Sequence, residues 1–400
     1  MPSSIRQIIA MSRAALLSLP RRLAISLSMI ASIMLVVCVL SAFLATARGF
    51  EVALQSAGSP DVAVILGSGA RHEGHSEISA DTIRALIAIG GDIGVVRESS
   101  NAPLISRELV VPVEYRSGDD AAGETLALRG MDSTGPGIRQ GVTLSSGHFA
   151  TSGSREIVVG DQLAASYPGF GIGDQVRLGP VAWTVAGHFS ARGSAFESEI
   201  WADLDTVRGA FNRAGEVQSL RLRLVYPNAI DTLRQAADSL PDTQLRIISE
   251  ADLYAGQSEG TAQLIRLFGW PIALLMAAGA VAGALNTMMS SLSDRTVEIA
   301  TVRALGFSRL SALLATWLEA MLLATVGVGL GLAVSWFGLN GWQASTLGAN
   351  DARMAFQLVV DADVMVMAGL VGITIGAIGG LLPALAAARL PITAALRARG

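Results

Sequence analysis

Four long stretches of the sequence contain almost no charged residues. Leu23 to Ala47 and Val364 to Ala388 each hold 25 residues without a charge, and Leu267 to Ser293 holds 27. The remaining stretch, Leu310 to Leu339, is interrupted only by Glu319. Because about 20 apolar residues cross the hydrocarbon layer of a bilayer as a helix, the pattern predicts four transmembrane helices, at 23–47, 267–293, 310–339 and 364–388.

The first stretch has a second interpretation, because a cleaved signal peptide also begins with basic residues and an apolar run. The apolar run is longer than that of a signal peptide, and no clear small-residue cleavage site follows before Arg48. An uncleaved span is therefore favoured.

Residues 48–266 have the patterns of strands and helices instead. The segment from Val217 to Tyr226 alternates leucine with arginine and predicts a half-buried strand with one face in water. Asp231 to Leu240 is amphipathic and predicts a helix with Asp231 as its N-cap, and a helix that begins near Ser249 is expected to run into the second span. Further strands are expected at Glu108–Tyr115, Thr125–Arg129, Glu156–Val159, Val181–Val185 and Gln244–Ile248, and a further helix at Ser79–Ile89. The predicted fold class is thus an α-helical membrane protein with a large α+β domain, 48–266, inserted between helices 1 and 2.

The distribution of arginine predicts which side of the membrane each segment faces. The first 22 residues and the tail 389–400 carry seven arginines and no acid, and the 294–309 loop carries three. The short 340–363 loop carries one arginine and three acids. Short arginine-rich loops stay in the cytoplasm, so both termini and 294–309 are expected inside, and 48–266 and 340–363 outside.

Composition agrees with this organisation and excludes several kinds of chemistry. Hydrophobic residues make up 51% of the 400 residues and charged residues 16%. All 29 basic residues are arginine. A phosphate-binding loop of the Walker A type and Schiff-base catalysis both need a lysine, so neither is expected here. The single cysteine, Cys38, lies in an apolar run and forms no disulfide framework.

The exterior segment shows no recognisable catalytic, cofactor or metal site. It carries 18 arginines and 27 acids, and this acidity argues against nucleic-acid binding. His72 to His75 does not have the H-E-x-x-H spacing of a zinc site and is expected to be a polar loop. Gly169 to Asp174 precedes a strand, where a turn is expected. His148 and His188 are isolated from any serine or acid partner in the sequence.

Glycines four residues apart mark helix faces on two spans. Such small-xxx-small patterns let helix backbones approach closely in lipid. The candidate packing residues are Gly279 and Gly283 on the second span, and Gly372, Gly376 and Gly380 on the fourth.

The segment from Asn286 to Gly306 is the most specific in the chain. It continues the second span towards the cytoplasm and reaches Gly306, a typical residue just after a helix end. The arrangement suits a short helix that docks into a groove of a partner protein. From the residues alone, an interfacial helix without a partner fits equally well.

This segment resembles the signature of the FtsX/MacB family of ABC transporter permeases. The similarity continues through Glu319, through Pro383, and through the motif from Arg389 to Arg397, and it covers the order of one span, a large domain and three spans. The family pattern is carried by Arg295, Glu298, Ile299, Arg303, Ala304, Leu305 and Gly306.

The resemblance implies a permease subunit in the bacterial inner membrane that dimerises with an identical or different permease. These seven residues would then form an ATPase-coupling loop for a cytoplasmic ABC ATPase, which binds ATP and Mg, while this chain carries no cofactor and no catalytic site. Since 22 residues precede the first span, the ATPase is expected to be a separate polypeptide. The complex would export or extract a substrate, with a periplasmic adaptor as a further partner. Alternatively, it transports nothing and activates an extracytoplasmic enzyme such as a cell-wall hydrolase.

Glu319 is an intramembrane polar residue, and a charge within a span is costly unless it is paired or hydrated. No other acid lies in a span, so a proton relay is disfavoured. Glu319 is expected to have a structural role, in which it pairs with an arginine on the cytoplasmic side or caps backbone near 294–309.

Overall fold

The computed structural model describes residues 6–13, 23–89, 94–97, 103–116, 123–240, 244–348 and 352–390. The chain forms two compact units. A helical unit comprises residues 1–48, 263–342 and 358–400, and a sheet unit comprises residues 49–262 and 343–357. Arg21, Arg22, Arg397 and Arg399, which contribute to the predicted orientation, lie outside the described residues.

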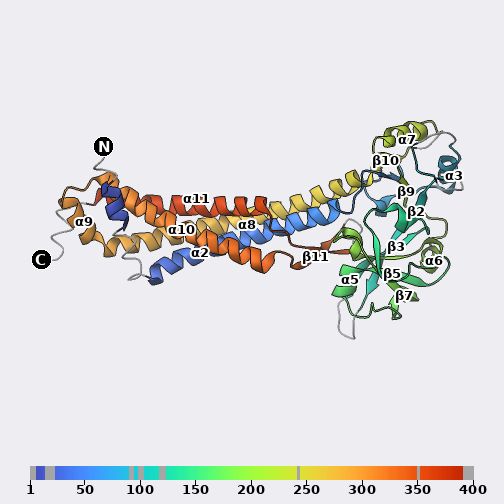
Figure 1. The fold of residues 1–400 in the computed structure, drawn as a ribbon, viewed down its shortest axis with the longest axis horizontal. Helices are drawn as coiled ribbons and strands as arrows, with labels where there is room; N and C mark the ends of the chain where they lie inside the picture. The colour runs from blue at the N-terminus through green and yellow to red at the C-terminus, as the bar shows by residue number, and fades with distance from the viewer. Residues whose placement is uncertain are drawn as a thin grey trace. The chain divides into compact units, whose positions relative to one another are not determined.

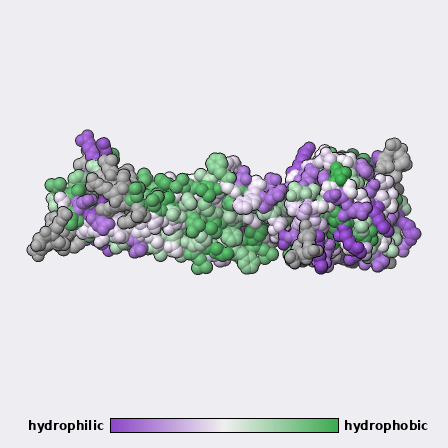
Figure 2. Space-filling model, turned by 90° about the horizontal axis from the view of Figure 1, so that it is seen from below, coloured by the Kyte–Doolittle hydropathy of each residue, from purple (hydrophilic) through white to green (hydrophobic). Residues whose placement is uncertain are grey.

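Among the described residues, four helices are long and apolar enough to cross a membrane. They are α2 (Leu23–Gln55), α8 (Glu250–Asp294), α10 (Arg309–Leu339) and α11 (Ala362–Arg389). Each contains one of the four uncharged stretches, and α2 and α8 extend beyond theirs. Figure 2 shows hydrophobic residues gathered over the surface of the helical unit, as a lipid-facing surface requires.

Small residues bring the helices of this unit close together. A Cβ atom added to Gly376 of α11 would lie 2.2 Å from the Cβ of Ala324 on α10, and one added to Gly380 would lie 2.4 Å from that of Ala320. At Gly372 it would meet Val328 at 2.5 Å. By contrast, Gly279 has no atom of the described chain within 4 Å, and Gly283 has only the Ser32 hydroxyl at 4.0 Å. Of the two predicted glycine faces, only the one on α11 packs closely.

The sheet unit is built on one ten-stranded sheet (Figure 1). The strand order is β10-β1-β9-β2-β3-β8-β5-β7-β4, with β6 paired to β7. Neighbours are antiparallel except for β3 with β8 and β5 with β7. The strands are β1 (Val62–Leu66), β2 (Ile105–Tyr115), β3 (Glu124–Met131), β4 (Thr143–Gly147), β5 (Glu156–Gly160), β6 (Gln175–Leu178), β7 (Val181–Ser190), β8 (Glu199–Asp203), β9 (Ser219–Arg223) and β10 (Arg246–Ser249).

Short helices complete this unit and cover two hydrophobic cores. One core lies among β2, β3, β5, β7 and β8, and the other lies among β1, β9, α3 and α7. The short helices are η2 (Glu73–His75), α3 (Ala80–Ala88), α4 (Gly135–Ile138), α5 (Asp161–Ser166), η3 (Ala195–Ser198), α6 (Leu204–Ala210) and α7 (Ala229–Asp238). The predicted α+β class is confirmed, as are the α3 helix, capped by Ser79, and the turn before β6.

Two local predictions are wrong. The segment 217–226 forms the shorter strand β9, and its arginine face is not the expected wet face, because Arg221 is 0% exposed and only Arg223 is partly exposed. The alternation of leucine and arginine has a period of two whether the arginines meet water or buried carboxylates, so the pattern could not separate these cases. In α7 the N-cap is Asn228, and Asp231 lies inside the first turn, where an acid also favours the helix dipole.

The predicted 340–363 loop contains a β-hairpin that belongs to the sheet unit. Its strands are β11 (Gln343–Leu347) and β12 (Arg353–Gln357), paired antiparallel from Gln343 opposite Gln357 to Leu347 opposite Arg353. On β12, Met354 and Phe356 are buried while Arg353 and Gln357 are exposed. The hairpin thus presents one apolar face to the rest of its unit.

Replacing Gly376 with leucine is expected to destabilise the helical unit. The side chain would overlap Ala324, and overpacking of this kind costs about 1–3 kcal/mol. The same change at Gly329 of α10, which has no neighbour of the described chain within 4 Å, is the matched control. Thermal stability of the detergent-solubilised chain, followed by size-exclusion chromatography, should fall for G376L and not for G329L. Equal losses would contradict this account of α11.

Candidate functional site

The segment predicted to couple to an ATPase forms a separate short helix. Helix α8 ends at Asp294, Arg295 leaves helical geometry with φ −106° and ψ 7°, and α9 then runs from Thr296 to Ala304. Gly306 ends the segment with φ +102°. A positive φ of this size disfavours any residue with a side chain, which explains why glycine ends the segment.

One face of α9 is packed inside the helical unit. Ile299 and Ala300 are 8% and 0% exposed, and Ile299 lies in an apolar cluster with Leu292, Ala312 and Ala387. These cluster partners come from α8, α10 and α11, so α9 contacts the ends of three spans.

Arg303 is also buried and donates from Nη1 to the carbonyl oxygen of Leu390 at 2.7 Å.

The other face of α9 is exposed, together with Leu305 and Gly306, which directly follow its last residue. Leu305 is 77% exposed, and Glu298, Ala304 and Gly306 are exposed as well. The seven residues singled out in the sequence therefore divide into two sets. Arg295, Ile299 and Arg303 fix the segment to the spans, and Glu298, Ala304, Leu305 and Gly306 lie on its surface.

Glu319 lies in the same region and has an arginine partner. Its side chain is 6% exposed, and its Oε2 accepts from Nη1 of Arg295 at 2.9 Å. The Nε of Arg295 also lies 3.5 Å from Oε2 of Glu298. Arg295 thus connects the buried acid on α10 with an exposed acid on α9, at the point where α8 and α9 meet.

A second group of charged residues is buried in the sheet unit, and sequence reasoning missed it. Arg129 of β3 and Arg221 of β9 both contact Glu73 of η2 and Glu108 of β2. All four side chains are at most 2% exposed. Three more residues join them and complete what we term the ion network: Arg139, Glu199 and Glu250.

Arg129 and Arg221 each bind three carboxylates, and Arg139 binds one with both of its terminal nitrogens. Arg129 donates to Glu199 at 2.6 and 2.7 Å and to Glu73 at 3.0 and 3.1 Å. Arg139 holds both oxygens of Glu108, at 2.6 and 2.8 Å. The planar guanidinium allows such bidentate contacts, which a lysine could not make. A signal was present in the sequence: Glu108, Arg129 and Arg221 each lie next to an apolar residue in segments with the pattern of strands.

These contacts keep Glu73 and Glu108 ionised despite burial. Burial alone would raise the pKa of Glu108, but the charges of Arg139, Arg221 and Arg129 outweigh it and lower that pKa to about 2. For Glu73, burial again acts upward, and Arg129 and Arg221 hold its pKa well below the ordinary value. Both groups are therefore charged at neutral pH, and their role is to hold elements together rather than to exchange protons.

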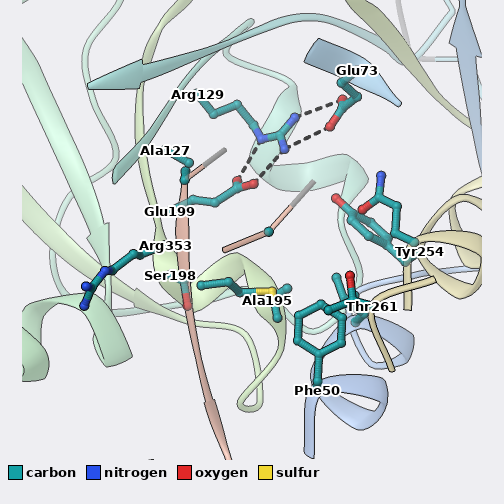
Figure 3. Close-up of a pocket in the computed structure, with 15 residues that line it drawn as sticks. Phe50, Glu73, Ala127, Arg129, Ala195, Ser198, Glu199, Tyr254, Thr261 and Arg353 are labelled. Atoms are coloured by element: carbon teal, nitrogen blue, oxygen red, sulfur yellow. Dashed lines mark hydrogen bonds and ion pairs between the residues drawn. The ribbon is translucent and has the colours of Figure 1, made fainter. Parts of the chain in front are cut away.

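A small cavity of about 70 Å³ lies beside the ion network, within the sheet unit (Figure 3). Glu73, Arg129 and Glu199 form one wall, joined by the hydrogen bonds drawn in the figure, and Tyr254 and Phe50 contribute from α8 and α2. The hairpin closes another side with Ala352, Arg353 and Met354. Both arginines of the cavity wall already have acidic partners, since Arg129 binds Glu73 and Glu199 and Arg353 binds Glu124.

The expectation that His148 and His188 lack a serine or acid partner is wrong, because Ser146 Oγ lies 3.4 Å from Nδ1 of His188 and Glu156 lies beside His148. The rings of His72 and His75 contact each other at the surface, with ring nitrogens 3.1 Å apart. His188 hydrogen-bonds the Phe170 carbonyl at 2.6 Å, and exposed His148 lies 3.6 Å from Glu156. Among the described residues, no three histidine, cysteine or acidic side chains are grouped to hold a metal.

Comparison with known protein families accounts for most of the chain. Residues 25–240 match the MacB-like periplasmic core domain. Residues 271–392 match the FtsX-like permease C-terminal domain, which includes α9 and its contacts. The chain belongs to the FtsX/MacB family of ABC transporter permeases. It is a membrane protein with four transmembrane helices and a large α+β extracytoplasmic domain between the first two, as the sequence predicts.

One curated relative is the macrolide export ATP-binding/permease protein MacB of Bordetella avium strain 197N. It is 25% identical over 332 residues, which cover 78% of this chain and 48% of the relative. The chain therefore spans about half the length of the curated relative it matches.

Two solved structures are similar over the extracytoplasmic domain. The extracellular domain of the noncanonic ABC-type transporter YknZ from Gram-positive bacteria is 14% identical, with 47% of this chain and 99% of that chain covered and a TM-score of 0.35. The periplasmic region of MacB from Actinobacillus actinomycetemcomitans is 13% identical, with coverages of 53% and 95% and the same TM-score.

Removing one arginine from the ion network is expected to destabilise the sheet unit strongly. Arg221→Met would leave Glu73, Glu108 and Glu250 short of a cation, and breaking a buried ion pair from one side costs about 3–5 kcal/mol. Arg84→Met, which removes an exposed pair with Asp81, should change little. Pulse proteolysis of the full chain in urea measures both, and equal midpoints for the two variants would contradict a stabilising ion network.

Glu319 and Arg295 are expected to act as one unit. Glu319→Gln and Arg295→Gln should each lower the thermal stability of the solubilised chain, because each leaves a largely buried charge without its main partner. The double variant should be no less stable than the worse single variant, since partners in one pair are not additive. Additive losses, or an unchanged E319Q, would rule out the structural role.

Proposed function

We propose that this chain is the permease subunit of an ABC transporter complex that couples ATP hydrolysis on a separate cytoplasmic ATPase to mechanical movement of the extracytoplasmic domain. The observation that carries the proposal is the two-faced helix α9. Its buried face is fixed to α8, α10 and α11, and its exposed face carries Glu298 and Leu305. A partner that binds the exposed face can therefore move three spans together.

In this proposal ATP and Mg bind to the partner and not to this chain. The sequence contains no lysine, so it offers no Walker A loop of its own. α9 and both termini face the cytoplasm, and the membrane is the bacterial inner membrane. The orientation follows from the arginine-rich segments on that side.

A second permease subunit is part of the proposed assembly. Four transmembrane helices enclose little space for a transport pathway by themselves. Small residues also bring α10 and α11 into close contact, which leaves no room for a pathway between these two helices. A dimer, identical or mixed, that acts mechanically fits these helices better than a channel within one chain. The work of the complex is export or extraction of a substrate, with a periplasmic adaptor as a further partner.

The same mechanical movement of the extracytoplasmic domain supports a second candidate function. A permease that moves its extracytoplasmic domain without transporting anything could activate an extracytoplasmic enzyme, such as a cell-wall hydrolase. In both cases the extracytoplasmic domain acts as a binding or force-transmitting module. The identity of the extracytoplasmic partner separates them: an adaptor supports export, and a hydrolase supports activation.

The test is to purify the full chain from native membranes and identify its partners by mass spectrometry. An ABC ATPase should be recovered together with the chain. Loss of the ATPase under conditions that preserve the membrane complex would refute the proposal.

Changes on the exposed face of α9 should uncouple the ATPase. Leu305→Asp and Glu298→Arg are expected to lower ATPase stimulation about tenfold, as at an interface hot spot, without loss of membrane insertion. The charge reversal Asp238→Arg, on the exposed side of α7, is the control.

The double change Glu298→Arg with Arg303→Glu should uncouple as well, but it also breaks the buried contact of Arg303 with Leu390. The surface variants are therefore the sharper probe. Undiminished stimulation in L305D and E298R would remove the coupling role from α9.

A further inference from the structure

The β11–β12 hairpin is attached to the sheet unit by contacts of three kinds. The hydroxyl of Ser198, at the end of η3, accepts from the backbone N–H of Ala355 at 2.9 Å and donates to its carbonyl at 3.0 Å. One side chain thus satisfies both polar backbone groups of a strand residue. Ser198 is 4% exposed, so these hydrogen bonds are shielded from water.

Apolar contacts add to these hydrogen bonds. Phe356 is 1% exposed, and its ring packs edge-on against that of Phe50, with centroids 5.7 Å apart. Ala352 packs in a small cluster with Val110 and Ala127 of the central strands. Burial of an aromatic side chain is one of the larger single contributions to such an attachment.

An ion pair at the edge completes the attachment. Nη1 of Arg353 lies 2.9 Å from Oε1 of Glu124, and both side chains are partly exposed. A pair of this kind stabilises little, about 0–1 kcal/mol. The hydrogen bonds and Phe356 therefore carry the attachment.

The hairpin is joined to two spans by very short links. Three residues separate the end of α10 at Leu339 from β11, and four separate β12 from the start of α11 at Ala362. Backbone hydrogen bonds also tie the two links together, from Gly341 to Leu358 at 2.9 Å and from Leu358 to Trp342 at 2.8 Å. Links of this length and bonding leave little slack, because an extended residue spans at most about 3.6 Å.

We propose that the β11–β12 hairpin is a permanent anchor through which α10 and α11 act on the extracytoplasmic domain, in addition to the continuous helices α2 and α8. The anchor stays docked throughout the working cycle. This inference rests on the proposed mechanical function, but the docking of the anchor can be tested without it.

The docking test uses a cysteine pair in the full chain. Cys38, the only natural cysteine, is replaced by serine, and Ser198→Cys is combined with Ala355→Cys. In native membranes without added ATPase, mild oxidation should join this pair in most molecules, since the Ser198 side chain lies against residue 355, with Oγ 2.9 Å from the backbone N and 3.0 Å from the backbone O of Ala355. Each single cysteine variant is the control. Failure of the pair to join would refute the docking itself, whatever the partner of α9.

The functional test measures ATPase stimulation in the complex. The variant with the oxidised cysteine pair should retain ATPase stimulation within about twofold. A disulfide that holds the hairpin docked changes nothing if the hairpin is docked throughout the cycle. Phe356→Ala, which removes the aromatic contact, should lower stimulation about tenfold. Adding the oxidised cysteine pair to Phe356→Ala should restore it, which a merely misfolded variant would not allow.

Two outcomes would overturn the anchor while leaving the proposed function intact. If oxidation abolishes stimulation and a reductant restores it, the hairpin must detach during the cycle. If Phe356→Ala has normal stimulation, α10 and α11 do not act through the hairpin. By contrast, a wild-type chain that binds no ATPase refutes the proposed function. The cross-linking result is independent of this outcome and still tests whether the hairpin is docked.

Discussion

The extracytoplasmic domain depends on the buried pairing of arginine with glutamate across its central strands. Arg129 on β3 and Arg221 on β9 flank Glu108 on β2, so the ion network crosses three adjacent strands of one sheet. The same arginines hold Glu73 of η2, and Arg221 also holds Glu250 at the start of α8. Burying so many charges is unfavourable unless all are paired. The ion network therefore favours one arrangement of these elements over others of similar hydrophobic content.

The helical unit uses a different principle, because in lipid there is little hydrophobic gain when one apolar helix meets another. Close approach of the helix backbones stabilises the unit instead, through van der Waals contacts. Gly372, Gly376 and Gly380 form a face of α11 that admits Ala320, Ala324 and Val328 of α10. At the end of this unit that carries α9, the pair of Arg295 with Glu319 adds a directional contact. The contacts at this end of the transmembrane helices therefore also hold α9 in place.

Most of the architecture could be predicted from the sequence, because apolar stretches and strand periodicity are local signals. The four long helices, the α+β class and the α9 segment with Gly306 all follow from such signals. The ion network could not be placed this way, since Glu73 and Arg221 are 148 residues apart in the chain and meet only through the order of the strands.

The division of α9 into two faces also needed the structure. Arg303 and Glu298 are both charged residues of one short helix, and only the packing of α9 against Leu292 and Ala387 shows that Arg303 is buried. The hairpin between α10 and α11 was missed for a related reason. Its five-residue strands carry too few apolar positions to be distinguished from a loop, and their burial depends on η3 and Phe50.

The start of α8 has one further consequence for how this helix can move. Ser249 caps α8 by accepting from the N–H of Asp252 at 3.0 Å, and Glu250, its first residue, is fully buried against Arg221. Neighbouring residues of a helix are separated by about 100° around its axis. A twist of that size would replace the Glu250 carboxylate by the methyl group of Ala251 and leave a guanidinium facing it. Helix α8 therefore cannot rotate about its own axis at this end without losing the contact between Glu250 and Arg221. If α8 rotates, the part of the domain around Arg221 must rotate with it.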